Sequence, residues 1–118
     1  MADTITRHNT NQRMSLSVEA GGLVYLAGLT AVEKRGASVT EQAQEILARI
    51  DSQLALSRTD KTRLISAQVW LTDISTFDEF NKVWDAWVAD AGKPVRACVE
   101  AALADPALNV EIMVTALR

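Results

Sequence analysis

The spacing of the apolar residues switches between two periods along the chain, and this alternation constrains the fold more than any other feature of the sequence. Apolar residues three or four apart at residues 39–57 and 77–88 predict two amphipathic helices. Elsewhere the spacing is two, or the apolar run is short and continuous, which predicts strands. We expect strands at residues 14–18, 23–27, 63–72, 95–102 and 108–117. Strands and helices in this order predict an α+β fold with two helices on one face of one sheet.

Two local signals support these boundaries. Gly21-Gly22 separates the first two expected strands and predicts a β-hairpin. Ser38 is followed three residues later by Glu41, which is the spacing of a capping box, so we expect the first helix to begin there. Its apolar stripe would face the sheet. The residues expected on its water-facing side are Gln42, Glu45, Arg49 and Gln53.

The length and charge of the chain limit the classes of protein to which it can belong. Its 118 residues predict a single domain, residues 1–118, in which residues 1–13 form a polar and mobile N-terminal segment. The net charge of −3 disfavours binding to nucleic acids. No apolar stretch is long enough to cross a membrane, and the polar start does not resemble a signal peptide. We therefore expect a cytoplasmic protein with no membrane or nucleic-acid partner.

The last two expected strands differ between their two faces. Small or β-branched residues at positions 95, 97, 99 and 101 predict a face that packs on the helices. The other face of the sheet is expected to carry Trp70, Arg96, Cys98, Glu100, Glu111, Met113 and Leu117. Two helices cannot cover both sides of a sheet this wide, and the second face carries few charges. We therefore expect a further copy of the chain, in a homo-oligomer, to cover it.

Most residue patterns that support catalysis are absent from the sequence. His8, the only His, has no partner at metal-ligand spacing, so we expect no metal site and a structural or surface role for His8. The expected second face brings Arg96, Cys98 and Glu111 together on neighbouring strands. There a guanidinium can bind a carboxylate while Glu111 handles a water molecule. A purely structural salt bridge between Arg96 and Glu111 is the alternative.

Several segments resemble the Rid/YjgF family of reactive-intermediate deaminases. The C-terminal signature of that family is matched by Pro94-Val95-Arg96-Ala97-Cys98-Val99-Glu100-Ala101-Ala102 and by Asn109-Val110-Glu111-Ile112. Further agreement lies in Val24-Tyr25-Leu26-Ala27-Gly28, Gln42 to Leu54, Val69-Trp70-Leu71-Thr72-Asp73 and Phe80-Asn81-Lys82-Val83-Trp84. The resemblance covers nearly all of residues 14–117.

The resemblance implies a chorismate-mutase-like α+β domain with a mixed sheet, assembled as a homotrimer with a central barrel and three clefts between subunits. It implies hydrolytic deamination of reactive 2-enamino or 2-imino acids to 2-keto acids and ammonia, without a metal or organic cofactor. The residue matching Arg96 binds the substrate carboxylate, and the residue matching Glu111 positions the attacking water. Cys98 and Gly28 match positions that line the cleft. Asn81 and Trp84 match positions near the cleft wall, with core packing as the alternative.

Two residues depart from the pattern of the best-known family members. Met14 stands where a tyrosine reaches the ligand, and Ala27 stands where a serine is common. A cleft with these residues offers fewer hydrogen bonds and more apolar surface. This composition favours either a bulkier, more apolar substrate or a non-catalytic, metabolite-binding regulatory trimer. Ribonuclease and chaperone roles are further alternatives, and Cys98 is expected to be a buried inert thiol rather than an oxidisable one.

Overall fold

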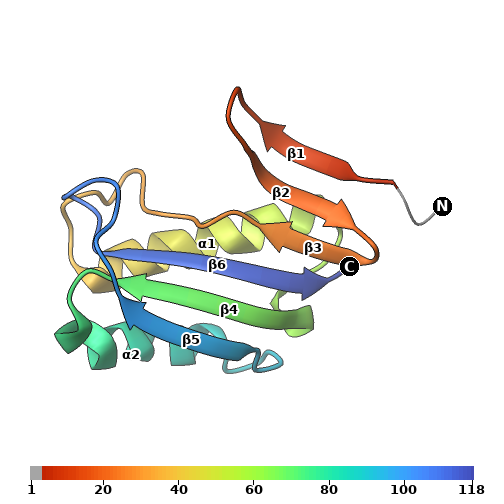
Figure 1. The fold of residues 1–118 in the computed structure, drawn as a ribbon. Helices are drawn as coiled ribbons and strands as arrows, with labels where there is room; N and C mark the ends of the chain where they lie inside the picture. The colour runs from red at the N-terminus through yellow and green to blue at the C-terminus, as the bar shows by residue number, and fades with distance from the viewer. Residues whose placement is uncertain (1–3) are drawn as a thin grey trace.

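A computed structural model describes residues 4–118 as one mixed β-sheet with two helices on one of its faces (Figure 1). The strands follow the order β1-β2-β3-β6-β4-β5, and β5 runs parallel to β4 while all other neighbours are antiparallel. The elements are β1 (Thr6–Thr10), β2 (Ser15–Ala20), β3 (Leu23–Leu26), α1 (Val39–Leu56), β4 (Leu64–Leu71), α2 (Phe77–Trp87), β5 (Val95–Glu100) and β6 (Val110–Leu117). The predicted α+β class, with both helices on one face, is confirmed.

The predicted hairpin is formed by β2 and β3. Gly21 and Gly22 have φ angles of 60° and 80°, a left-handed conformation that glycine adopts without steric cost and that a two-residue hairpin turn requires. The α1 helix begins where the capping-box spacing placed it, because the Ser38 hydroxyl accepts a hydrogen bond of 3.2 Å from the backbone N–H of Glu41. Local sequence signals therefore predicted both features correctly.

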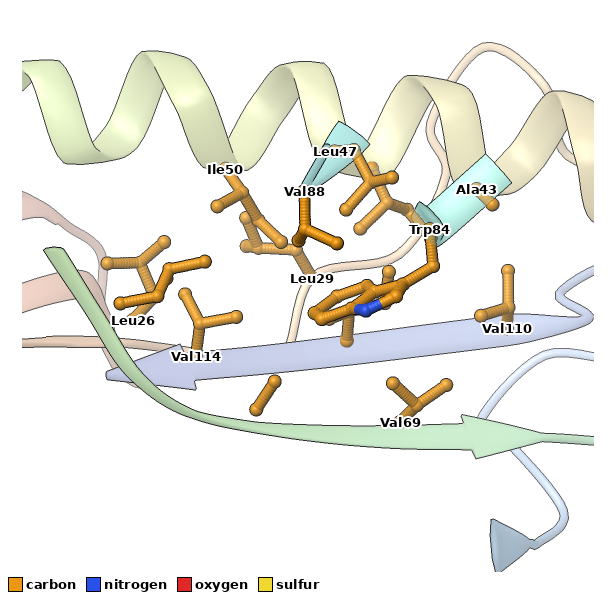
Figure 2. Close-up of a cluster of buried hydrophobic side chains, with 14 of the residues drawn as sticks. Leu26, Leu29, Ala43, Leu47, Ile50, Val69, Trp84, Val88, Val110 and Val114 are labelled. Atoms are coloured by element: carbon orange, nitrogen blue, oxygen red, sulfur yellow. The ribbon is translucent and has the colours of Figure 1, made fainter. Parts of the chain in front are cut away.

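The core lies between the two helices and the strands β3, β4 and β6. Apolar side chains of α1 point down onto the sheet, where they meet those of β3, β4 and β6 and the Trp84 ring of α2 (Figure 2). Ala43, Ile46, Ile50 and Leu54 on α1 are fully buried, as the helical spacing predicted. Burial of apolar area on this scale supplies the main free energy that holds the helices to the sheet.

The N-terminal segment is more ordered than the sequence predicted. Residues 6–10 form the edge strand β1, which pairs with β2, so the expectation of a mobile segment is wrong. His8 lies on this strand, and its Nε2 is 2.7 Å from Oε2 of Glu19 on β2. The sequence did not predict this strand because main-chain hydrogen bonds hold it in place, and these leave no trace in the hydrophobic pattern. The structural role expected for His8 is consistent with this contact.

Two glutamines of α1 that were expected to face water are instead buried. Gln42 is fully buried and Gln53 is 7% exposed. Each side-chain amide is hydrogen-bonded to a segment far away in the sequence, which offsets the cost of removing it from water. The helical spacing placed them outside the apolar stripe correctly, but it contained no information about the distant segments that cover them, residues 107–109 for Gln42 and the strands β1 and β2 for Gln53.

The strand β5 presents the opposite face from the one expected. Its parallel register pairs Arg96 with Ala67 and Cys98 with Val69, and Ala67 and Val69 are buried against the helices. Arg96 and Cys98 therefore lie on the helix side of the sheet, while Val95 is on the uncovered side and 73% exposed. The prediction failed because it assumed that the apolar face of a strand must pack on the core of its own chain. The alternation shows only that one face is apolar, and it does not show what covers that face.

The uncovered face of the sheet is rich in exposed apolar side chains. The large ones are Tyr25, Val95, Val99, Met113 and Leu117, each at least 41% exposed. They come from β3, β5 and β6, so the apolar character extends across the sheet. The expectation that the uncovered face is rich in apolar residues is therefore confirmed. On β5, however, Val95 and Val99 lie on that face instead of Cys98. Among residues 4–118, no helix has the length and apolar character needed to cross a membrane.

Candidate active site

Arg96 is held at the edge of the sheet by side chains of α2. Its guanidinium carbon lies 5.3 Å from the centre of the Trp84 ring. The rings of Phe77 and Phe80 are each 5.8 Å away. A fourth contact fixes its orientation, because Nη1 donates a hydrogen bond of 2.9 Å to Oδ1 of Asn81. A cation stacked on aromatic faces and hydrogen-bonded once is pre-organised for an anion, since its remaining N–H donors are in a fixed plane.

The aromatic support of Arg96 was only partly visible in the sequence. The helical spacing of apolar residues at 77–88 predicts a stripe that packs in the core, and Phe80 and Trp84 are indeed buried. Phe77, however, is 38% exposed beside the guanidinium. Nothing in a helical repeat distinguishes a ring that fills the core from one that also supports a cation.

Cys98 and Asn81 belong to the surroundings of Arg96. Cys98 follows on the same face of β5 and is partly buried against the core. Burial raises the pKa of the Cys98 thiol, and the positive charge of Arg96 opposes that shift only in part. The neutral thiol therefore dominates at neutral pH, as expected of an inert cysteine. Asn81 reaches Arg96 from α2 and accepts the hydrogen bond from its Nη1.

Glu111 and Gly28 form a second group on the uncovered face. The Glu111 side chain packs directly over Gly28, with its carboxyl carbon 3.0 Å from where a Cβ of residue 28 would lie. A side chain at that position would overlap Oε2 of Glu111, so only glycine admits the carboxyl there. Burial raises the pKa of Glu111 above its ordinary value of 4.5.

Arg96 and Glu111 do not lie on one face of neighbouring strands, contrary to the sequence prediction. The strand β4 separates β5 from β6, and the two side chains are on opposite faces of the sheet. Arg96 is level with Ala67 of β4, and Glu111 is level with Trp70, three positions further along. That offset is about 10 Å along the strand. The expected site residues of one chain therefore fall into two separate groups, which we name the Arg96 half-site and the Glu111 half-site, and the salt bridge between Arg96 and Glu111 is not formed.

Met14 lies at the end of the sheet where Gly28 and Glu111 are found. It immediately precedes β2, whose first residues pair with the end of β3, and its side chain is 41% exposed. Its backbone N–H is held by the side chain of Asn11 at 2.9 Å. In the strand order, the strand β2 that follows Met14 is separated from the strand β5 that carries Arg96 by β3, β6 and β4. Within residues 4–118, no three His, Cys, Asp or Glu side chains gather closely enough to hold a metal ion.

Comparison with known proteins gives matches over almost the whole chain. The family described as Endoribonuclease L-PSP matches residues 4–118. A RutC family protein of Haemophilus ducreyi is 39% identical over 112 residues, which is 95% of each chain. The RutC family protein YoaB of Escherichia coli is 35% identical, over 96% of this chain and 97% of that one.

Solved structures show the same architecture. A member of the YjgF protein family from Neisseria meningitidis has a TM-score of 0.95 and 40% identity, with 100% of this chain and 98% of that chain covered. A member of the YjgF/YER057c/UK114 family from Mycobacterium tuberculosis has a TM-score of 0.87 at 26% identity. On sequence and fold together, the chain belongs to the Rid/YjgF family.

Proposed function

We propose that this protein hydrolyses reactive 2-imino acids and their 2-enamino tautomers to 2-keto acids and ammonia, in clefts between the subunits of a homotrimer. The observation that carries the proposal is the Arg96 guanidinium, held in a fixed plane by Asn81 and three aromatic rings at an edge strand. A guanidinium fixed in this way suits a planar carboxylate, which it can bind through two parallel hydrogen bonds.

The chemistry follows from placing a carboxylate on Arg96 and a water molecule on Glu111. With the acid anchored, the water oxygen adds to the imine carbon and the nitrogen takes up a proton, giving a carbinolamine. The carbon–nitrogen bond then breaks, ammonia leaves, and the carbonyl of the keto acid forms. Glu111 holds the water and takes its proton, a task for which a carboxyl with a raised pKa is well suited. Such positioning suffices for a reaction that already proceeds in water.

The separation of the half-sites supports a cleft between subunits. Arg96 and Glu111 lie on opposite faces of one sheet, so a small substrate cannot touch both within one chain. The apolar uncovered face, with Val95, Val99 and Met113 exposed, is suited to contact with further copies. A closed ring of copies would bring the Arg96 edge of one chain beside the Glu111 face of the next.

The test is the rate of ammonia and keto-acid release from imino acids generated in situ by an amino-acid oxidase, over side chains from methyl to aromatic. We expect wild type to accelerate release and Arg96→Ala to raise KM by more than about tenfold, because each hydrogen bond to a charged carboxylate contributes about 1.5–3 kcal/mol. Arg7→Ala, on the opposite edge strand β1, is the matched control and should keep the wild-type rate. An unchanged KM in folded Arg96→Ala would refute the assignment.

A non-catalytic, metabolite-binding trimer is the second candidate. It is favoured by Met14, whose exposed thioether adds apolar surface and no strong hydrogen-bond donor near the Glu111 half-site. It predicts saturable binding of a 2-keto acid that Arg96→Ala abolishes, with no acceleration of ammonia release by wild type. Cleavage of RNA is less compatible with the net charge of −3, and a salt-sensitive RNA cleavage lost in Arg96→Ala would be needed to support it.

A further inference from the structure

The side chain of Gln42 joins two loops that are far apart in the sequence. It projects from the first turn of α1 and is fully buried. Its Nε2 donates hydrogen bonds to the carbonyl oxygens of Ala37, at 3.1 Å, and Ala107, at 2.9 Å. Its Oε1 accepts a hydrogen bond of 2.8 Å from the backbone N–H of Asn109. Both amide hydrogens and the amide oxygen are thus used.

Further hydrogen bonds reinforce the same junction. The Asn109 side chain donates to the Ala37 carbonyl at 2.9 Å, and the Gly36 N–H donates to the Ala107 carbonyl at 2.9 Å. On its other side, the Asn109 carbonyl accepts from the N–H of Thr72 at the end of β4, at 3.0 Å. The backbone that enters β6 is therefore held from both sides.

This junction lies immediately before the Glu111 half-site. Asn109 precedes Glu111 by two residues, so its position sets where β6 begins. Leu29 and Ile112 exchange two main-chain hydrogen bonds, at 2.8 and 3.1 Å, which tie Gly28 to the same stretch of β6. The loop that leaves Gly28 then returns to α1 at Ser38. The segment that begins at Gly28 and the segment that leads into β6 are thus joined twice. Near Gly28 they are joined by main-chain pairing, and near the start of α1 they are joined through Gln42.

We infer that Gln42 is a positioning residue, which holds the start of β6 so that the Glu111 carboxyl stays seated over Gly28. The inference rests on the proposed function, because it assigns Gln42 to the half-site that directs the water. It also explains why a polar side chain occupies a fully buried place on α1, where an aliphatic one would fill the same space. Without the amide, the backbone groups of Ala107 and Asn109 would lose these partners and the loop would be free to shift.

The structure supplies a matched control for the experiment. Gln53 lies on the same helix, is 7% exposed, and donates from Nε2 to Ser17 Oγ and to Asn9 Oδ1, each at 2.9 Å. These contacts connect α1 to β1 and β2 rather than to β6. Gln53→Met and Gln42→Met therefore remove the same amide from the same helix, but only Gln42→Met removes it beside the Glu111 half-site.

Steady-state kinetics on 2-imino acids would be measured at a temperature where both variants are folded by circular dichroism. We expect Gln42→Met to lower kcat by about tenfold or more, since small displacements of a catalytic group have effects of this size. Its KM should change little, because Arg96 is untouched. Gln53→Met should lower the melting temperature while kcat stays near the wild-type value. Equal kcat values in the two variants would overturn the inference.

A second measurement separates this inference from the proposed function. Carbon-13 NMR of the Glu111 side-chain carboxyl follows its titration without any turnover. In Gln42→Met, a carboxyl released from Gly28 into water should titrate at a lower pH than in wild type. If wild type does not accelerate deamination, the proposed function fails while this titration still decides the role of Gln42. An unchanged Glu111 titration in Gln42→Met would show that Gln42 is only structural.

Discussion

Burial beside Gly28 raises the pKa of Glu111 above its ordinary value of 4.5. If Glu111 takes a proton from water, only its ionised form is active, so kcat/KM should fall as the pH falls through that raised pKa. A pH profile of the wild type should therefore show an acidic limb with a midpoint above 4.5, and Glu111→Gln should be slow at every pH without that limb. A midpoint at or below 4.5 would contradict the assignment of Glu111 as the base.

Gly28 offers a test of the position of the Glu111 carboxyl. The φ angle of Gly28 is not in the left-handed region, so alanine can adopt its backbone, but its Cβ would overlap the carboxyl. We expect Gly28→Ala to remain folded and to lose about tenfold to a hundredfold in kcat, because the carboxyl must move. Gly92→Ala is the control, because its added Cβ would also be close to a neighbour, 3.2 Å from the Thr62 carbonyl oxygen, but outside the site. Wild-type kcat in Gly28→Ala would show that the seat over Gly28 is dispensable.

Glu19 is a residue whose ionisation stabilises the fold. Its hydrogen bond to His8, assisted by that to Ser57, lowers the pKa of Glu19 from 4.5 to about 2. A lowered carboxyl pKa stabilises the folded state above the unfolded value of 4.5, and that contribution is lost as the pH falls from 4.5 to about 2. Urea unfolding should show Glu19→Gln to be less stable than wild type by about 1 kcal/mol at pH 6.

The pH dependence distinguishes the charge of Glu19 from its shape. Below pH 2 the difference in unfolding free energy between wild type and Glu19→Gln should shrink, because Glu19 is then protonated in both states. A difference that persists unchanged at low pH would mean that packing, not ionisation, carries the effect.

At the scale of elements, α2 acts as the support of Arg96 as well as a cover for the sheet. Phe77 is the most exposed of its three stacking rings, so its removal disturbs the core least. A cation–π contact of this kind is worth about 0.5–1 kcal/mol, which corresponds to roughly a twofold to fivefold weaker affinity for a carboxylate ligand. We expect that loss in Phe77→Leu and recovery in Phe77→Tyr, measured by calorimetry with a 2-keto acid. Equal affinities of wild type and Phe77→Leu for the 2-keto acid would show that Phe77 does not contribute to ligand binding.

At the scale of the whole molecule, the two half-sites make a prediction about mixed assemblies. Arg96→Ala and Glu111→Gln should each impair every cleft when alone, the first by weaker substrate binding and the second by slow turnover. If the chain assembles as the proposed trimer, each cleft in trimers formed from equal amounts of both variants would take its arginine and its glutamate from different subunits. About a third of the clefts in the mixed trimers, or about a quarter before those trimers are isolated, would then contain both native residues and recover activity. Co-expression with two affinity tags isolates the mixed trimers for assay.

The control is each variant co-expressed with a differently tagged copy of itself, which should stay inactive. Mixed assemblies with no activity would mean that one chain supplies both residues to a cleft. A monomer by sedimentation would remove the intersubunit cleft altogether.

The sequence alone determined both helices, the strands other than β1, and most of the core. The helical spacing of Ile46, Ile50 and Leu54, the cap at Ser38 and the Gly21-Gly22 turn are local properties, since each depends on residues within a few positions of one another. The family resemblance of the C-terminal segments is likewise a property of the sequence, and the comparisons confirm it.

Only the tertiary structure decided which face each edge strand presents and which polar groups are buried. Arg96 lies on the helix side because β5 pairs in register with β4, some 29 residues earlier in the chain. Gln42 is buried because residues 107–109 close over it. Both outcomes depend on partners distant in the sequence, which hydrophobic periodicity does not contain. The separation of Arg96 from Glu111, on which the proposed intersubunit cleft depends, could be known only from that pairing.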